Sequence, residues 1–152
     1  MSEKKIEGIM RDFVEAIEEK NVEKALSFLT DDADYVTPEG TFKGKEELRR
    51  YLTWGTQTTP NQKVRDAGIS IMVKGNKAVF EHIVEGTYEN TKYEALTICV
   101  YEFSDEKIQH LRTVVDRLSI AKQVAKGWFA KRIMNSIIAR ALTRVRISPG
   151  LP

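Results

Sequence analysis

The side chains with the clearest capacity for chemistry lie in the stretch KIQHLRTVVD, residues 107–116. Its alternation predicts a strand that places Ile108, His110, Arg112, Val114 and Asp116 on one face. A histidine titrates near neutrality, and burial can raise the pKa of a carboxylate toward the same range. If this face lines a pocket, His110 and Asp116 are candidates for an acid–base pair with Asp116 as the base; the alternative is that the face is the solvent side of a sheet.

The composition indicates a single globular chain without a disulfide framework. Of 152 residues, 41% are apolar and 30% are charged, which is ordinary for one folded domain. The single cysteine, Cys99, excludes an intramolecular disulfide, and no apolar run is long enough for a signal peptide or a membrane span. The expected location is the cytoplasm.

Metal and cofactor sites are not predicted. The two histidines, His82 and His110, lie too far apart in sequence to give a metal-ligand spacing, and no inward-pointing acidic cluster accompanies them. The glycines form no phosphate-binding loop; Gly68, Gly75 and Gly86 instead fit a bulge, a turn and a bend in curved strands. We expect neither a metal nor a cofactor.

Hydrophobic periodicity divides the chain into helices, then strands, then helix again. Helical spacing is found at residues 3–20, 22–29 and 45–54, with a short strand and a Pro38–Gly40 turn between the second and third helices. Period-two alternation follows at residues 64–73, 77–89, 91–103 and 107–116. This order predicts an α+β fold in which the helices cover one face of a largely antiparallel sheet.

The first half of the chain carries a family resemblance. RDFVEAIEEKNVEKALSFLTDDADYVTPEG and FKGKEELRRYL resemble the opening helices, strand and turn of the nuclear-transport-factor-2-like superfamily, which includes ketosteroid isomerase and the SnoaL-like polyketide cyclases. The resemblance covers about residues 3–120. It implies a cystatin-like α+β barrel, a cone-shaped curved sheet of mixed or antiparallel strands wrapped on the N-terminal helices, with a pocket for a small molecule.

The isomerase's own functional residues are missing from this sequence. The positions of its tyrosine and two aspartates fall on Phe13, Thr37 and Cys99, none of which can supply that chemistry. In the isomerase an apolar site keeps one of the aspartates protonated as a donor, and a cysteine in its place is a weak donor at best. We therefore do not expect ketosteroid isomerase activity.

The cyclase branch fits better, because its last strand often has the cadence seen from Lys107-Ile108 through His110 to Asp116. The resemblance and the alternation of side chains along each strand predict which residues face the pocket. Some of them are predicted to be catalytic and others to line its wall. The predicted catalytic residues are Asp116, His110, His82 and Tyr101, with Tyr101 as a donor to a developing oxyanion. The predicted pocket-lining residues are Phe13, Thr37, Trp54, Phe80, Thr97, Cys99 and Val114.

Each of these assignments has a structural alternative. Asp116 directly precedes a helical pattern, so it also suits an N-terminal cap or an ion pair with Arg112 or Arg117. Cys99 is equally consistent with a small apolar residue that packs in the core. A histidine on a half-apolar strand is equally consistent with a structural role. The function predicted is therefore binding of a small organic ligand, with isomerisation or cyclisation of a carbon acid as the enzymatic form, and a non-catalytic interaction protein as the alternative.

The end of the chain is basic. From residue 120 to residue 152 there are seven basic side chains and no acidic one, whereas residues 1–119 carry 17 basic and 22 acidic side chains, a net of −5. We predict a domain at 1–119, a basic amphipathic helix at 120–147 that Gly127 kinks or divides, and a disordered tail at 148–152. The helix is expected to pack on the acidic body or on a second copy, most simply in a homodimer; an anionic membrane surface is the alternative partner and nucleic acid is less favoured.

Overall fold

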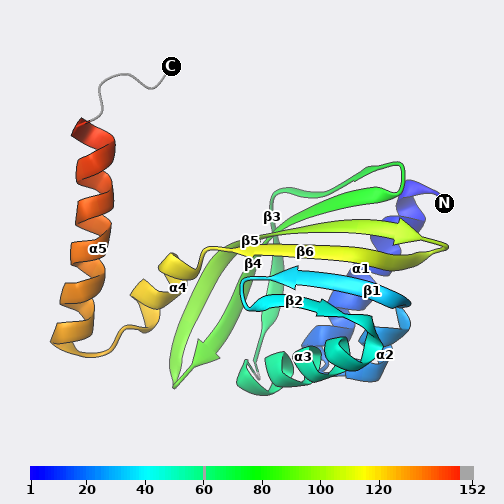
Figure 1. Cartoon of the computed structure of the whole chain (residues 1–152), viewed down its shortest axis with the longest axis horizontal. Coiled ribbons are helices and arrows are strands. Elements are labelled where there is room, and N and C mark those ends of the chain that lie inside the picture. Colours follow the sequence, from blue (N-terminus) through cyan, green and yellow to red (C-terminus); the bar gives the residue numbers. More distant parts are fainter. Residues whose placement is uncertain (60, 148–152) are drawn as a thin grey trace.

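Within the described residues, the chain folds into three N-terminal helices, six strands and two C-terminal helices (Figure 1). The computed structural model describes residues 1–59 and 61–147, so the tail predicted at 148–152 lies outside the described residues. The helices are α1 (Glu3–Glu18), α2 (Val22–Ser27), α3 (Gly44–Thr58), α4 (Arg117–Val124) and α5 (Gly127–Ile147). The strands are β1 (Leu29–Thr37), β2 (Gly40–Lys43), β3 (Lys63–Lys74), β4 (Lys77–Tyr88), β5 (Thr91–Ser104) and β6 (Lys107–Val115).

The first two helices begin at polar caps. The Ser2 hydroxyl accepts a hydrogen bond from the Lys5 amide at 3.3 Å, and the Asn21 side chain accepts one from the Lys24 amide at 3.0 Å. Such caps satisfy amides that have no partner inside the helix. The predicted interruption at Asn21 is thus the start of α2.

All six strands belong to one sheet, in the order β2-β1-β6-β5-β4-β3. Every neighbouring pair is antiparallel except β1 and β6, which run parallel. The α+β prediction is confirmed, and the open, curved sheet fits the predicted cone. The sequence pattern did not reveal β2, and the short strand that it predicted before the Pro38–Gly40 turn is longer than expected, because β1 begins at Leu29 within the predicted second helix.

A wide bulge in β3 helps to bend the sheet. Between Asp66 and Ile71, four residues of β3 lie opposite Glu81 alone on β4. Gly68 has a φ of +51°, and an added Cβ there would lie 2.1 Å from the Glu81 carboxyl group. The same carboxylate accepts a hydrogen bond from the Ile69 amide at 3.0 Å. The predicted bulge at Gly68 is therefore present, and only glycine fits it without displacing Glu81.

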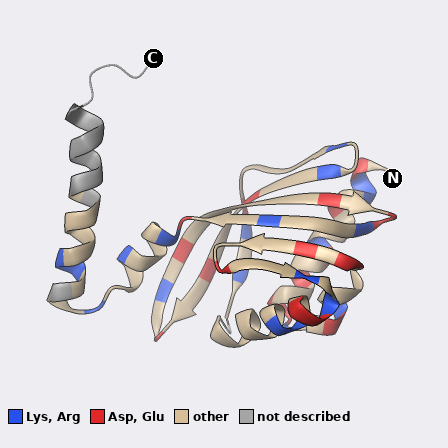
Figure 2. Ribbon diagram, viewed as in Figure 1, with Lys and Arg blue, Asp and Glu red and all other residues tan. Residues whose placement is uncertain are grey.

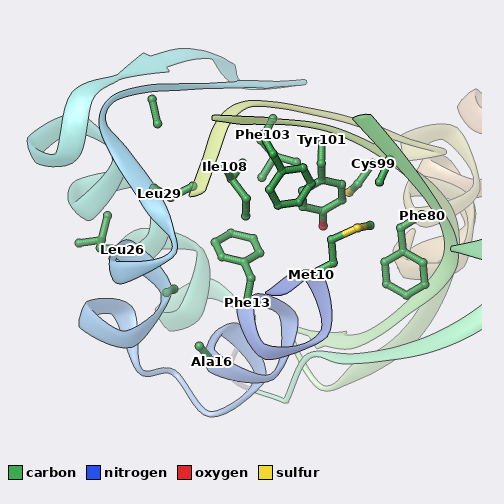
Figure 3. Packing of buried hydrophobic residues seen from close by; sticks show 14 of the residues in the cluster. Met10, Phe13, Ala16, Leu26, Leu29, Phe80, Cys99, Tyr101, Phe103 and Ile108 are labelled. Atoms are coloured by element: carbon green, nitrogen blue, oxygen red, sulfur yellow. The ribbon is translucent and has the colours of Figure 1, made fainter. Parts of the chain in front are cut away.

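The hydrophobic core lies between α1 and the concave face of the sheet (Figure 3). Met10 and Phe13 of α1 point toward Tyr101 and Phe103 of β5, and the rings of Phe13 and Tyr101 meet edge to face at 6.4 Å. Along β5 the odd-numbered residues from Ala95 to Phe103 are buried, while Leu96 and Ile98 are exposed. The two faces of the sheet are thus clearly distinguished, one packed and one open.

The predicted C-terminal helix begins at Arg117 and is divided in two. The break lies at residues 125–126, and Gly127 has a φ of +81°, a conformation that favours glycine. The first part of the predicted helix, which belongs to α4, packs on the body against β5, whereas Figure 1 shows α5 projecting away from the sheet and from α1–α3. Among the described helices, none is both long enough and apolar enough to span a membrane.

Candidate functional site

A cavity of about 740 Å³ opens beside the core, between α3, the concave face of the sheet and α4. Strand β1 contributes Tyr35, and the strands β4, β5 and β6 contribute Val84, Thr97 and Thr113 respectively. Because α4 follows β6 directly, its residues close one side of the cavity. The helix contributes Arg117, Ile120, Ala121 and Val124.

One polar feature beside the cavity is a chain of three hydrogen-bonded side chains from adjacent strands. The Tyr35 hydroxyl lies 2.9 Å from Thr113 Oγ1, and Cys99 Sγ lies 3.1 Å from the same oxygen. Cys99 and Thr113 are cross-strand partners on β5 and β6, which brings their side chains to the same face. We call Tyr35, Cys99 and Thr113 the hydroxyl wall.

Burial keeps the wall protonated. It raises the pKa of Tyr35 well above its ordinary value, with the hydrogen bond from Thr113 acting in the opposite direction. Burial likewise raises the pKa of the Cys99 thiol to about 11 and raises the pKa of Tyr51. At neutral pH these groups are therefore uncharged donors and acceptors rather than bases or thiolates.

The charged side chains of the cavity lie at its rim. Glu39, in the turn between β1 and β2, forms an ion pair with Arg117 at the start of α4, and its Oε2 accepts a hydrogen bond from the Tyr51 hydroxyl at 3.3 Å. The Glu39 amide donates to Thr37 Oγ1 at 3.2 Å, which fixes the turn. Glu39 and Arg117 are the charged residues among those that line the cavity.

Helix α4 is held against an open length of strand. Strand β6 ends opposite Thr97, so it leaves the first residues of β5 unpaired on that side, and α4 lies along them. The Asp116 amide donates to the Leu96 carbonyl at 3.1 Å, and the Gln123 side chain makes hydrogen bonds of 3.0 and 2.7 Å to the Glu94 amide and carbonyl. These bonds satisfy strand groups that would otherwise need water, and they fix the helix over the cavity.

An aromatic cluster separates this cavity from a second, shallower hollow of about 560 Å³ on the outer side of α3 and β2. Tyr51 meets Tyr35 edge to face at 5.4 Å, stacks on Phe42 at 4.3 Å and lies 5.9 Å from Trp54. Tyr51 and Trp54 line both hollows, and 48% of Trp54 is exposed.

The structure places the predicted wall residues in three groups. Thr97 and Trp54 line the cavity as predicted, while Thr37 is buried behind the rim and Cys99 behind Thr113. Two further predicted wall residues, Phe13 and Phe80, lie in the core under α1 and do not line the cavity. The predicted catalytic residue Tyr101 lies in the same core.

His82 faces the concave side, as predicted, but it is part of the packed interior. Only 4% of it is exposed, its ring lies 4.3 Å from that of Phe80, and its Nδ1 lies 3.3 Å from the Phe80 carbonyl oxygen. Burial lowers the pKa of His82, and the nearby Asp66 carboxylate acts in the opposite direction. These contacts favour a structural, neutral histidine.

His110 and Val114 lie on the opposite face from Tyr101, so their predicted orientation is wrong. An extra residue, Gln109, interrupts the β5–β6 register between Ile108 and His110, and Tyr101 therefore pairs with Leu111. Val114 is 69% exposed, and His110 Nδ1 lies 3.0 Å from Asp34 Oδ2 on the outer face.

Asp116 does not join a histidine. It is exposed and caps α4, where its carboxylate accepts a hydrogen bond from the Ser119 amide at 2.9 Å. The geometry of Asp116 is thus that of the helix cap given above as the alternative. The fold does not bring the four predicted catalytic residues together at one point; they are Asp116, His110, His82 and Tyr101.

Sequence reasoning missed several of the polar lining residues, among them Tyr35, Glu39, Thr113 and Arg117. One signal was available, since Ile108 and Leu111 are three residues apart, a spacing that a regular strand cannot bury on one face. A bulge inferred from that spacing would have turned Thr113 inward. Within the described residues, no three His, Cys, Asp or Glu side chains gather as metal ligands.

The family follows from a comparison of the sequence with known domains. The model of the SnoaL-like domain matches residues 10–111, which is more than half of the chain. The chain belongs to the SnoaL-like domain family. No curated protein matches the sequence.

Solved structures with the same fold have little sequence identity to this SnoaL-like chain. A putative polyketide cyclase from Xanthomonas campestris pv. campestris has a TM-score of 0.73 and 17% identity, covering 80% of this chain and 97% of that chain. A hypothetical protein with a ketosteroid isomerase-like fold from Catenulispora acidiphila, in complex with trimethylamine, has a TM-score of 0.69 and 16% identity over 76% and 90% of the two chains. A de novo designed protein with a curved β-sheet has a TM-score of 0.62 and 20% identity over 91% and 98%. These matches establish the fold.

Proposed function

We propose that this SnoaL-like protein binds a small, largely apolar organic molecule that carries at least one hydroxyl or carbonyl group. The observation that carries the proposal is that Tyr35 and Thr113 of the hydroxyl wall line a cavity of about 740 Å³, a volume within the range of ordinary ligand pockets. Apolar side chains from α4 and β4 supply contact area, and the neutral hydroxyls supply orientation. The Catenulispora relative, which holds trimethylamine, supports a binding role for this fold.

Removal of a single hydroxyl tests this proposal. Thr113→Val keeps the shape of the side chain but removes the oxygen that bridges Tyr35 and Cys99. A panel of hydroxylated aromatic and polyketide-like compounds is screened by thermal shift, and the Kd of each hit is then measured by calorimetry. We expect Thr113→Val to weaken binding about tenfold, which corresponds to the ~1.4 kcal/mol of one well-placed hydrogen bond.

Val114→Thr is the matched control, because it adds a hydroxyl to the neighbouring residue on the opposite face of β6. The control is expected to bind as the unmodified protein does. Equal affinity of Thr113→Val and the unmodified protein for every hit would contradict binding at the hydroxyl wall.

A second candidate is acid–base chemistry on a carbon acid, and it is favoured by the position of Glu39. This carboxylate lines the cavity beside two donors, the Tyr51 hydroxyl and the Arg117 guanidinium. In such a reaction Glu39 takes a proton from the carbon next to a carbonyl, and the electron pair moves onto the carbonyl oxygen. A neighbouring donor stabilises that oxyanion until Glu39 returns the proton to another carbon.

Glu39→Gln separates the two functions. An enzyme would lose turnover by several orders of magnitude while it kept its ligand affinity, whereas a binding protein would show no turnover in either form. Slow exchange of the acidic hydrogen of a bound ligand with deuterated water, followed by NMR, is the direct measurement. Undiminished exchange in Glu39→Gln would contradict the role of Glu39.

We also propose that the protein forms a homodimer through the outer face of its sheet. Val114 and Ile98 are cross-strand neighbours, and Leu96 adjoins them, with exposed fractions of 69%, 38% and 45%. Ion pairs flank this apolar strip at both ends, Arg65 with Glu85 and Arg112 with Glu102. Because both signs of charge occur at each end, a second copy related by a two-fold axis can match them.

A further inference from the structure

Helix α5 has an amphipathic sequence, and its described residues make few contacts with the rest of the chain. Its apolar residues Ala130, Ile133, Met134 and Ile137 recur at intervals of three and four, which places them on one side of the helix. Ile133 is 46% exposed and Ile137 is 50% exposed, and Figure 1 shows the helix projecting away from the sheet.

The same helix carries only positive charge. Its sequence contains five basic residues and no acidic one, and the whole segment from residue 120 onward contains no acid. Where the side chains of α5 are described, Figure 2 shows basic but no acidic residues. The protein's net charge of +2 therefore arises from an acidic body and this basic end. The field around α5 is set by its own lysines and arginines.

Charge decides between the partners that an apolar stripe would suit. Pairing of α5 with α5 of a second copy would bring ten positive charges together without a single acid to offset them, which opposes a helical pair. Nucleic acid would satisfy the arginines and lysines but offers no partner for Ile133 and Ile137. An anionic lipid surface satisfies both, because phosphate groups lie above an apolar layer.

We propose that α5 binds the surface of membranes rich in anionic phospholipids, lying in the interface with Ile133 and Ile137 toward the acyl chains. Lys131 and Arg132 then meet lipid phosphates. Trp128, which is 71% exposed and has the Arg132 guanidinium 5.2 Å from its ring centre, belongs to the residue type that favours the headgroup region. The inference does not depend on what the cavity binds.

Attachment at α5 has a consequence for the cavity. Only residues 125–126 separate α5 from α4, and α4 supplies Ile120, Ala121 and Val124 to the cavity lining. The helix that closes the cavity therefore lies next to the bound membrane.

Vesicle sedimentation with the full chain tests the proposal. We expect binding to vesicles of equal parts phosphatidylglycerol and phosphatidylcholine, at least tenfold weaker binding to pure phosphatidylcholine, and loss of binding at high salt. Lys131→Glu with Arg132→Glu should lower binding at least tenfold. The charge-matched control is Lys4→Glu with Lys74→Glu, two exposed positions on the body, and it should bind nearly as the unmodified chain does.

Two further measurements identify the helix and the class of partner. Anionic vesicles should shift the tryptophan emission to shorter wavelength, and Trp128→Phe should abolish most of that shift. Ile133→Asp, at an exposed position outside the folded core, should weaken vesicle binding without changing the unfolding transition.

Three outcomes would overturn the proposal. The first is absence of binding to anionic vesicles, and the second is equal loss in both double variants. The third is binding of α5 to another partner without vesicle binding, seen either as retention of an RNA or DNA oligonucleotide or as a change of oligomeric state on Lys131→Glu with Arg132→Glu.

Discussion

At the scale of single residues, the cavity is polar without being charged in its interior. Tyr35, Thr113 and Cys99 share hydrogen bonds of 2.9 and 3.1 Å, and burial raises the pKa values of both Tyr35 and Cys99. Groups that keep their protons can orient a ligand or stabilise an oxyanion, but they cannot remove a proton from carbon. Any base at this site must therefore come from the rim, where Glu39 lies.

Cys99 is expected to be chemically inert in the folded protein. With a pKa of about 11, the fraction present as thiolate at pH 7 is on the order of one in 10⁴, and only 6% of the residue is exposed. Alkylation by iodoacetamide, followed by mass spectrometry, should be at least about a hundredfold slower in the native state than in urea.

The control for this experiment is Ser136→Cys in a Cys99→Ser background, which places a thiol on an exposed position of α5. That thiol should react at the same rate with and without urea. Rapid labelling of native Cys99 would show that the thiol is accessible and ionised, and would support a nucleophilic role for it.

His82 should make the protein less stable in mild acid. Because burial lowers its pKa in the folded state, the unfolded chain takes up the proton first as the pH falls through the ordinary histidine value of about 6.5. Stability is therefore lost between that value and the lower folded pKa, and it is unaffected above both. Each unit of depression corresponds to about 1.4 kcal/mol.

Urea unfolding at pH 7.5 and pH 5.5 measures this effect. His82→Phe should reduce the difference in unfolding free energy between the two pH values, and the half-exposed His110→Gln should serve as the control for a surface histidine. An identical pH dependence in His82→Phe and the unmodified protein would show that other groups, such as the Asp66–Arg11 pair beside it, dominate.

At the scale of helices and strands, α4 is the element on which the cavity depends most. Asp116 caps the start of α4, and Gln123 near its end is hydrogen-bonded to β5. The first residue of the helix, Arg117, forms the ion pair with Glu39. The sequence indicated a helix here but did not indicate what it contacts. The helix covers the edge of β5 that is left open beyond the end of β6. That edge depends on the lengths of two strands, which periodicity predicts only to within a few residues.

Asp116 variants distinguish a cap from a base. Asp116→Ala should lower the unfolding free energy by about 1 kcal/mol and weaken ligand binding, because α4 loses its capping hydrogen bond. Asp116→Asn should have almost no effect, since asparagine caps helices as well as aspartate does. Thermal unfolding and ligand titration provide both readouts.

A contradictory outcome is equally clear for this pair. If Asp116→Asn kept its stability and its affinity but lost turnover, the carboxylate would have a chemical role that the capping geometry does not explain. Equal stability of Asp116→Ala and the unmodified protein would instead show that the other contacts of α4, such as the hydrogen bonds between Gln123 and Glu94, hold it without the cap.

The strands show why the fold could be predicted from the sequence and half of the site could not. Alternation in β5 correctly indicated that Thr97, Cys99 and Tyr101 face inward, because that strand is regular up to Glu102. One extra residue at Gln109 then reverses every later side chain of β6, from His110 to Val114. A family resemblance conveys the order of elements, but a single-residue bulge alters which side chains meet.

At the scale of the whole molecule, the described acidic side chains all lie on the body, while the described part of α5 carries only basic ones (Figure 2). The acidic body and the basic end were both evident from composition, and the structure adds that Lys131 and Arg132, the described basic residues of α5, form no ion pair with the body. The exposed apolar strip of Val114, Ile98 and Leu96 lies on the sheet rather than on the helix. Dimerisation and membrane attachment would thus use different surfaces and can be tested independently.

The proposed dimer predicts that one outward-facing charge will produce monomers. Val114→Glu places a carboxylate at the most exposed apolar position of the strip, where a two-fold axis would bring two such charges close together in an apolar contact. Light scattering after size exclusion should give a mass near the 17.4 kDa of one chain for the variant and twice that for the unmodified protein. Thr113→Val, which changes only the inner face of the same strand, should remain dimeric.

A chain that ends at residue 126 should also remain dimeric, because it lacks α5 but keeps the strip. If this shorter chain became monomeric while Val114→Glu did not, the helix rather than the sheet would hold the two copies together.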